Sequence, residues 1–129
     1  MATRSTIGMV QEGGTIRSIY CHFDGYPDGV GVVLKDHYTD TTTIENLLDL
    51  GDLSVLDVEI GEKQDFGARK EGWCLFYGRD RGEDGIDALV HADEHEWIGF
   101  RRGSWCEYGY LWANGEWHTF KITPEYANA

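Results

Sequence analysis

The cysteines and histidines of this chain are its strongest candidates for catalysis. Cys21 and His22 are neighbours in a segment whose alternating pattern predicts a β-strand. Adjacent side chains of a strand point to opposite faces, so these two cannot pair as nucleophile and general base. A small Cys/His-dependent enzyme would need Cys21 beside a histidine from elsewhere in the chain: His91, His95 or His118. The sequence shows no such pairing, and we assign no catalytic residue.

A metal site is the second chemistry that the histidines suggest. His91 and His95 are four residues apart, a spacing that puts two imidazoles on one face of a helix. The His-Glu-x-x-His order of a zinc protease is missing, and the three cysteines form no C-x-x-C pair. We therefore expect no metal and no cofactor, and we expect Cys21, Cys74 and Cys106 to be buried, reduced thiols. The two histidines, which lie among carboxylates, are expected to titrate near neutral pH.

A glycine-rich stretch at residues 24–31 (DGYPDGVG) lies between a predicted strand and a predicted helix. Backbone N–H groups in such a loop can hold an anion. Here no lysine follows, and Asp24 and Asp28 would repel a phosphate. We interpret the glycines as enabling a tight turn, Pro27 as fixing it, and Asp28 as capping the helix.

Acidic residues dominate the charge of the chain. Twenty-three acids stand against eleven bases, a formal net charge of −12, and residues 23–65 hold eleven acids against two lysines. Such a chain repels nucleic acid, whose binding depends on neutralising phosphates with cations. An acidic surface instead favours solubility or docking on a basic protein groove. We predict a protein-binding surface made of Asp36, Asp40, Glu45, Asp49, Asp52, Glu83, Asp84 and Asp87.

The chain also combines arginines with five tryptophans, more than a core of this size needs. An arginine beside an exposed aromatic ring is typical of interface hot spots and can also hold the phosphate and base of a nucleotide. An alternative ligand-binding set, with the arginines exposed, is Tyr26, Arg79, Arg81, Arg101, Arg102 and Trp105.

The first half of the chain must position the acidic residues. Residues 6–11 and 15–23 predict a β-hairpin. Apolar residues then recur at helical spacing and predict a short helix with one buried face: Val30, Val33, Leu34, His37 and Tyr38. A second helix follows, with Thr42 and Glu45 as a capping box and Gly51 just beyond its end. Residues 52–72 predict a connection with a short strand.

The second half predicts mainly strands. Residues 72–78 are apolar enough for a central strand, and residues 79–85 form an exposed charged turn. Residues 86–97 are irregular or helical. Two strands, 105–112 and 116–122, flank Asn114-Gly115, a strong hairpin signal.

The pattern predicts an α+β fold: an antiparallel sheet of about five strands with a two-helix hairpin packed on one face. We expect one domain at residues 1–124 and a loose tail at 125–129, where Pro124 ends the strand pairing. No apolar run reaches the length of a membrane span, and no signal peptide is evident.

Four blocks of the sequence resemble a family of small, mostly uncharacterised proteins of tailed bacteriophages and prophages. They are MATRSTIG at residues 1–8, IYCHFDGYPDGVG at 19–31, LGDLS at 50–54 and YGRDRGE at 77–83. The resemblance covers most of the chain and implies a phage origin and action in the host bacterial cytoplasm. It brings no established catalytic residue.

By analogy with other small acidic phage proteins, the expected function is non-catalytic: inhibition of a bacterial antiviral defence component, in the manner of an anti-CRISPR protein, through the acidic surface. The expected partner is a host defence protein, with no direct nucleic-acid or membrane binding. A sponge that sequesters a nucleotide signal, the thiol enzyme and a homodimer stay open as alternatives.

Overall fold

The structure is a computed structural model that describes residues 2–125, so the predicted tail lies outside the described residues from 126 onward. Its elements in chain order are β1 (Ser5–Val10), β2 (Ile16–Cys21), the π-helical turn η1 (Pro27–Gly31), α1 (Val32–His37), α2 (Thr41–Asp49), β3 (Leu53–Val55), β4 (Leu75–Phe76), α3 (Tyr77–Arg81), β5 (Leu89–His91), α4 (Glu94–Gly103), β6 (Tyr108–Ala113) and β7 (Glu116–Lys121).

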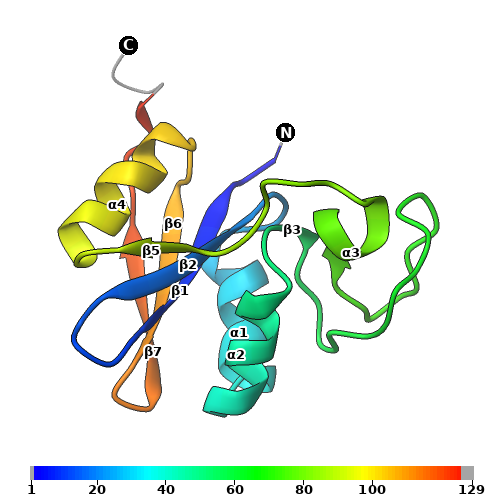
Figure 1. The fold of residues 1–129 in the computed structure, drawn as a ribbon, viewed down its shortest axis with the longest axis horizontal. Helices are drawn as coiled ribbons and strands as arrows, with labels where there is room; N and C mark the ends of the chain where they lie inside the picture. The colour runs from blue at the N-terminus through cyan, green and yellow to red at the C-terminus, as the bar shows by residue number, and fades with distance from the viewer. Residues whose placement is uncertain (1, 126–129) are drawn as a thin grey trace.

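The strands form one sheet in the order β4–β3–β2–β1–β6–β7, and β5 pairs with β2 beside β3. The predicted α+β class is confirmed (Figure 1). The sheet is mixed rather than purely antiparallel, because β1 runs parallel to β6 and β2 parallel to β3. In both cases a helical connection separates the paired strands along the chain, which is the arrangement that parallel pairing requires.

Both predicted hairpins are confirmed. β1 pairs antiparallel with β2 over its whole length, and β6 pairs antiparallel with β7 from Tyr108 to Ala113. The second turn contains Asn114 and Gly115 at φ values of 54° and 76°. Two successive residues with positive φ suit the right-handed twist of a hairpin, and asparagine followed by glycine is the pair that tolerates them best.

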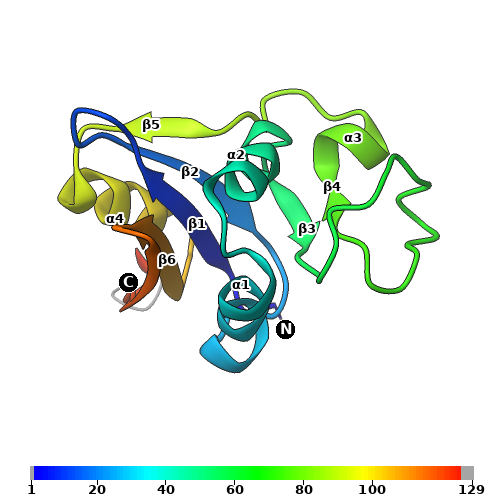
Figure 2. The same ribbon diagram turned by 90° about the horizontal axis from the view of Figure 1, so that it is seen from below.

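Helices α1 and α2 cover one face of the sheet, as predicted (Figure 2). Val30, Leu34 and Tyr38 point into the core from η1 and α1, where they meet Ile7 and Ile19 of the sheet. The predicted buried stripe of this helix is right at those three positions. It is wrong at His37, which is exposed because it ends the helix on the solvent side.

Helix α2 begins two residues earlier than the capping-box prediction. Asp40 is the N-cap, and its Oδ1 accepts a 2.8 Å hydrogen bond from the backbone N–H of Thr43. Thr42 therefore lies inside the helix instead of capping it, since the carboxylate of Asp40 already satisfies the free amide. The end of α2 is as predicted, because Gly51 has a φ of 81° directly after the C-cap. The predicted cap at Asp28 is wrong: η1 starts after Tyr26 with no side-chain cap.

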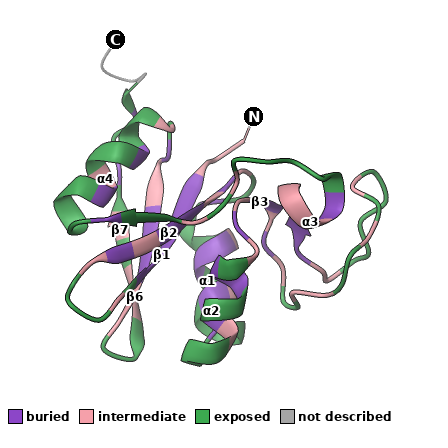
Figure 3. Ribbon diagram, in the orientation of Figure 1, coloured by how far each residue is buried: buried purple, intermediate pink, exposed green. Residues whose placement is uncertain are grey.

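The opposite face of the sheet is covered by α4, which the sequence left irregular or helical. Trp97 of α4 is completely buried against Gly8 and Gly109, two sheet residues whose missing side chains make room for the indole. Its Nε1 donates a 3.1 Å hydrogen bond to Thr6. Figure 3 shows the outcome: exposed outer faces on the helices, and mostly buried residues in the strands β1 and β2 between them.

The predicted central strand at 72–78 is wrong. Only Leu75 and Phe76 form a strand, and this β4 lies at the edge of the sheet. The chain turns into α3 directly afterwards, because the buried carboxylate of Asp80 accepts the backbone N–H of Phe76 at 2.9 Å. The expected charged turn therefore begins as a helix, and its exposed part is confined to residues 81–85.

Candidate functional site

The exposed acidic residues of α2 follow from the way this helix packs. Ile44, Leu47 and Leu48 face the core, so Glu45 and Asp49, four residues apart, must share the outward face. Asp49 forms a 2.7 Å ion pair with Arg17 of β2, and both partners lie near the surface. The outer side of α2 is thus negative, with one cation at its end.

The segment that follows α3 extends this negative surface. The backbone N–H of Asp52 donates a 2.8 Å hydrogen bond to the carbonyl of Ile86, which places residues 83–87 beside the end of α2. We define the acidic surface as the exposed members of the predicted set, without Asp40, which caps α2: Asp36, Glu45, Asp49, Glu83, Asp84 and Asp87.

Two acids of the predicted set serve the fold instead. Asp40 uses its carboxylate to cap α2, and the backbone hydrogen bond from Thr43 lowers the pKa of Asp40. Asp52 is half-buried, and its Oδ1 accepts the backbone N–H of Tyr20 at 2.8 Å. Burial raises the pKa of Asp52, against the opposing effect of that hydrogen bond. Neutralising either residue would disturb the structure, so neither is suited to a test of partner binding.

The predicted set of exposed arginines is wrong at Arg79 and Arg101. The guanidinium of Arg79 donates to the carbonyls of Ile60 and Cys74 at 2.9 and 3.0 Å and pairs with Asp80. Arg101 is a buried residue of α4, and its guanidinium donates to Ser18 of β2. Both guanidiniums donate hydrogen bonds to groups within the protein, because buried charges need such partners. They are therefore not available to bind a ligand.

Arg81 and Arg102 are exposed, but they do not come together. Arg81 lies over the rings of Phe66 and Tyr77 and pairs with Glu83. Arg102 donates a 3.0 Å hydrogen bond to the carbonyl of Thr123. Helices α3 and α4, which carry the four arginines, lie at opposite ends of the molecule (Figures 1 and 2). The alternative ligand set therefore does not form one site.

The two aromatic members of that set are exposed, at Tyr26 and Trp105. The Tyr26 hydroxyl donates to Asp24 at 3.3 Å. Trp105 is 48% exposed, and the Arg4 guanidinium lies 5.5 Å from its ring centroid. Trp105 also has a φ of 62°, a left-handed conformation that is uncommon for a bulky residue.

The cysteines are buried and reduced, as predicted. Burial raises the pKa of Cys21 and of Cys106 to about 12, so both thiols are protonated at neutral pH. His22 lies on the opposite face of the strand from Cys21, and its Nδ1 is 2.7 Å from the Tyr20 hydroxyl. Within residues 2–125 no histidine is hydrogen-bonded to Cys21, whose thiol instead donates to the carbonyl of Phe23.

His91 and His95 do not share a helix face, because His91 ends β5 and His95 lies in α4. His91 is instead part of a buried network that the sequence did not reveal. Ser18 accepts a 2.9 Å hydrogen bond from Arg101 and lies 2.8 Å from Nε2 of His91. Burial, followed by the charge of Arg101, lowers the pKa of His91, which corrects the expected titration near neutrality.

This network joins α4 and β5 to the sheet. Ser18 is 0% exposed and His91 only 4% exposed, and the serine oxygen is occupied by a cationic donor. A serine nucleophile needs access to substrate and an available lone pair on its oxygen. Ser18 has neither, so this network is suited to stabilising the fold and not to catalysis. The one signal in the sequence is Ser18 itself, a polar residue that shares one face of its strand with Ile16 and Tyr20.

No cluster of three or more His, Cys, Asp or Glu side chains within residues 2–125 is arranged to hold a metal ion. In the same part of the chain, no helix combines the length and apolar character needed to cross a bilayer.

Comparison with known proteins adds no relative. No protein-family model, curated protein or solved structure matches the chain.

Proposed function

We propose that this protein is a phage accessory protein that inhibits a bacterial antiviral defence component by binding it, in the manner of an anti-CRISPR protein. The observation that carries the proposal is the acidic surface, in which the outer face of α2 and the segment 83–87 lie side by side. The resemblance to phage proteins supplies the expected setting, the host bacterial cytoplasm.

The partner that fits this surface is a protein with a basic groove, such as one that normally holds nucleic acid. Complementary charge speeds encounter and favours that partner over acidic ones. Carboxylates that occupy the groove exclude the phosphates for which its lysines and arginines are placed. Inhibition then requires only binding and no chemical step.

A plating experiment tests the proposal. The chain is expressed in bacterial hosts that each carry one active defence system, and phage plaques are counted. We expect the wild-type protein to restore plaques on at least one host. The triple variant Glu45→Gln, Asp84→Asn, Asp87→Asn should lose this protection, because all three carboxylates are exposed on the acidic surface.

The matched control removes the same charge elsewhere. Glu62, Glu71 and Glu94 are also exposed, in the 56–74 loop and in α4, and the triple change to Gln should preserve protection. Equal protection by the two triple variants would contradict the role of the acidic surface. Failure of the wild type on every host of the panel would contradict inhibition of those defences.

The nucleotide sponge stays a prediction. Its arginines are divided between α3 and α4, which weakens it, but Arg4 and Trp105 lie together at the surface. Melting the protein with a panel of cyclic and ADP-ribose-type nucleotides tests this alternative. A rise in melting temperature that Trp105→Ala abolishes would favour it over the acidic surface.

A further inference from the structure

The ends of the two hairpins form a surface that the proposed function does not use. Because β1 and β6 run parallel, with Met9 beside Trp112, the turns that follow them lie at the same end of the sheet. Two hollows open there, of about 330 and 440 Å³, and both are lined by Trp112 and Gly115.

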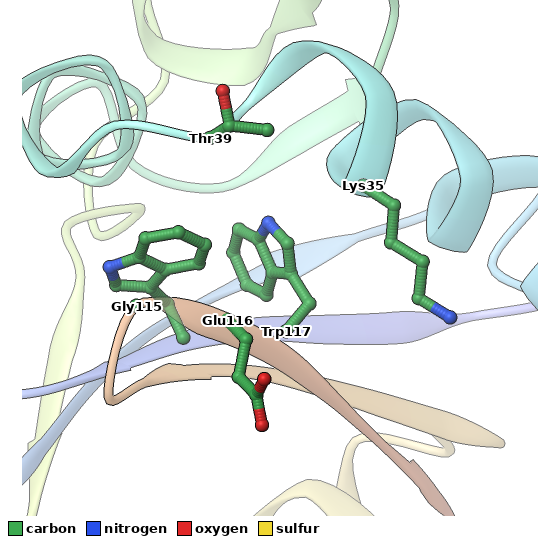
Figure 4. A pocket seen from close by; sticks show the side chains of 6 residues that line it. Lys35, Thr39, Gly115, Glu116 and Trp117 are labelled. Carbon is green, nitrogen blue, oxygen red and sulfur yellow. The ribbon is translucent and has the colours of Figure 1, made fainter.

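The smaller hollow is lined by one basic and one acidic side chain, those of Lys35 and Glu116. Lys35 of α1 lies beside Trp117, and Thr39 is a further lining residue (Figure 4). Trp117 is held by a 2.8 Å hydrogen bond from its Nε1 to the carbonyl of Tyr38. Its ring lies 5.3 Å from that of Trp112, centroid to centroid, so the two indoles fix one another.

The larger hollow, which we call the turn groove, has a different character. Its further lining residues are Met9, Val10, Gln11, Glu12, Thr41, Ala113 and Asn114. Of its charged and amide groups, Glu12 supplies a carboxylate, while Gln11 uses its amide nitrogen on the carbonyl of Met9 and keeps its oxygen as an acceptor. No lysine or arginine is among these described lining residues. The groove thus combines an indole, an apolar wall and negative or acceptor groups.

The positive end of the α2 helix dipole lies beside this groove, but it does not repel a cation there. A helix N-terminus carries a partial positive charge, and Thr41 is the first residue of α2. Asp40 places its carboxylate at this end, where both of its oxygens bond to Thr43. The negative charge of Asp40 therefore offsets the helix dipole beside the groove.

We propose that the turn groove binds an arginine side chain of a protein partner, with the guanidinium stacked on Trp112 and paired with Glu12. The aliphatic part of the arginine covers Met9 and Val10. Arginine fits better than lysine, because its planar guanidinium stacks on an aromatic ring and pairs with a carboxylate in the same plane. The inference rests on the proposed function only for the source of the arginine, a basic protein surface.

A peptide titration tests this inference without any host protein. The probe is an acetylated, amidated pentapeptide with one arginine between glycines, and the control peptide has lysine instead. We expect the Nε1–H resonance of Trp112 to shift saturably with the arginine peptide. That of Trp97, buried and bonded to Thr6, should stay in place. Binding of the arginine peptide should be at least about threefold tighter than that of the lysine peptide.

Variants then locate the site. Glu12→Gln should weaken binding of the arginine peptide about three- to tenfold, and Trp112→Phe should reduce the preference for arginine over lysine. Lys35→Gln, in the neighbouring hollow, should leave the affinity within about twofold. Melting temperatures verify that each variant is folded, and Glu12 is exposed in a turn, so its change does not disturb the core.

Two results would overturn the proposal: equal affinity for both peptides, or unchanged binding by Glu12→Gln. The double variant Asp84→Asn, Asp87→Asn provides the separation from the proposed function. Both residues lie beside the C-terminal end of α2, about 12 Å along the helix from Thr41 in the groove lining. This exceeds the Debye length of about 8 Å at 0.15 M salt, so the variant should bind the peptide like the wild type even where it no longer protects phage.

Discussion

The carboxylate of Asp80 accepts the backbone N–H of Phe76 at 2.9 Å and that of Gln64 at 3.0 Å, so it joins the last strand residue to the long loop before it. Burial alone would raise the pKa of Asp80, but the hydrogen bonds from Arg79, Phe76 and Gln64 together lower it. The ionised carboxylate is thus built into the fold.

Asp80→Ala should destabilise the protein by about 3 kcal/mol, because it leaves the largely buried guanidinium of Arg79 without its carboxylate partner. Because the pKa of Asp80 is lowered in the folded protein, the ionised carboxylate stabilises the fold fully above the ordinary aspartate pKa of about 4. This contribution is lost as the pH falls below that value. Urea unfolding at pH 7 measures the loss. Asp65→Ala, at an exposed residue of the same loop, is the control and should cost below about 1 kcal/mol.

His91 should make the stability depend on pH in a different range. Its pKa is lowered, so the unfolded chain takes up a proton below about pH 6.5 while the folded protein still excludes it. Stability is therefore full above that pH and declines as the pH falls. Denaturant midpoints at pH 7.5 and 5.5 should differ more in the wild type than in His91→Gln. An equal difference in the two proteins would contradict the buried, neutral imidazole.

The two glycines Gly25 and Gly99 should respond in opposite directions to alanine. A Cβ on Gly25 would lie 2.7 Å from the carbonyl oxygen of Thr3, a backbone atom that cannot move away easily. We expect Gly25→Ala to cost about 2 kcal/mol or more. A Cβ on Gly99 meets open space on helix α4, so Gly99→Ala should stabilise by about 0.5–1 kcal/mol. Thermal melts of both variants compare the two directly.

The N-cap of α2 distinguishes Asp40 from Thr42. Asp40→Ala removes the hydrogen bond to Thr43 and should destabilise the protein by about 1 kcal/mol. Thr42→Ala changes an exposed residue within the helix and should be neutral or slightly stabilising. If Thr42→Ala were instead the more damaging change in urea unfolding, the capping box would be right and the observed cap wrong.

The cysteines should be unreactive in the folded protein. All three are buried, and the pKa of Cys21 and Cys106 is raised to about 12, so the thiolate that reacts is scarce at pH 7.5. A colorimetric disulfide reagent should detect no thiol within minutes, and three after denaturant is added. Rapid reaction of a thiol in the native protein would revive the thiol-enzyme alternative.

The two hairpins and the helices α1 and α2 were predictable because their signals are local. Asn114-Gly115 specifies its turn, and Ile44, Leu47 and Leu48 specify the buried side of α2 without reference to the rest of the chain. The segment 72–78 was not predictable in the same way. Its apolar residues fit a central strand, and only the distant contacts of Asp80 with Gln64 and Phe76 determine where the strand ends.

The candidate site was predictable in its charge and not in its arrangement. Exposed acids on α2 follow from the helical pattern, whereas the approach of residues 83–87 to α2 depends on the hydrogen bond between Asp52 and Ile86. Arg79 and Arg101 were expected at the surface because arginine usually is. Their burial depends on partners, Asp80 and Ser18, that no spacing pattern could assign.

The parallel pairing of β1 with β6 joins residues about a hundred positions apart, from Ser5 beside Tyr108 to Met9 beside Trp112. During synthesis β1 and β2 can close their hairpin early, but one edge of β1 stays open until nearly the whole chain has been made. Contacts between such distant segments slow folding, and an open strand edge promotes association between chains. Chains truncated before β6 should therefore aggregate, and swift release of the complete chain favours correct assembly.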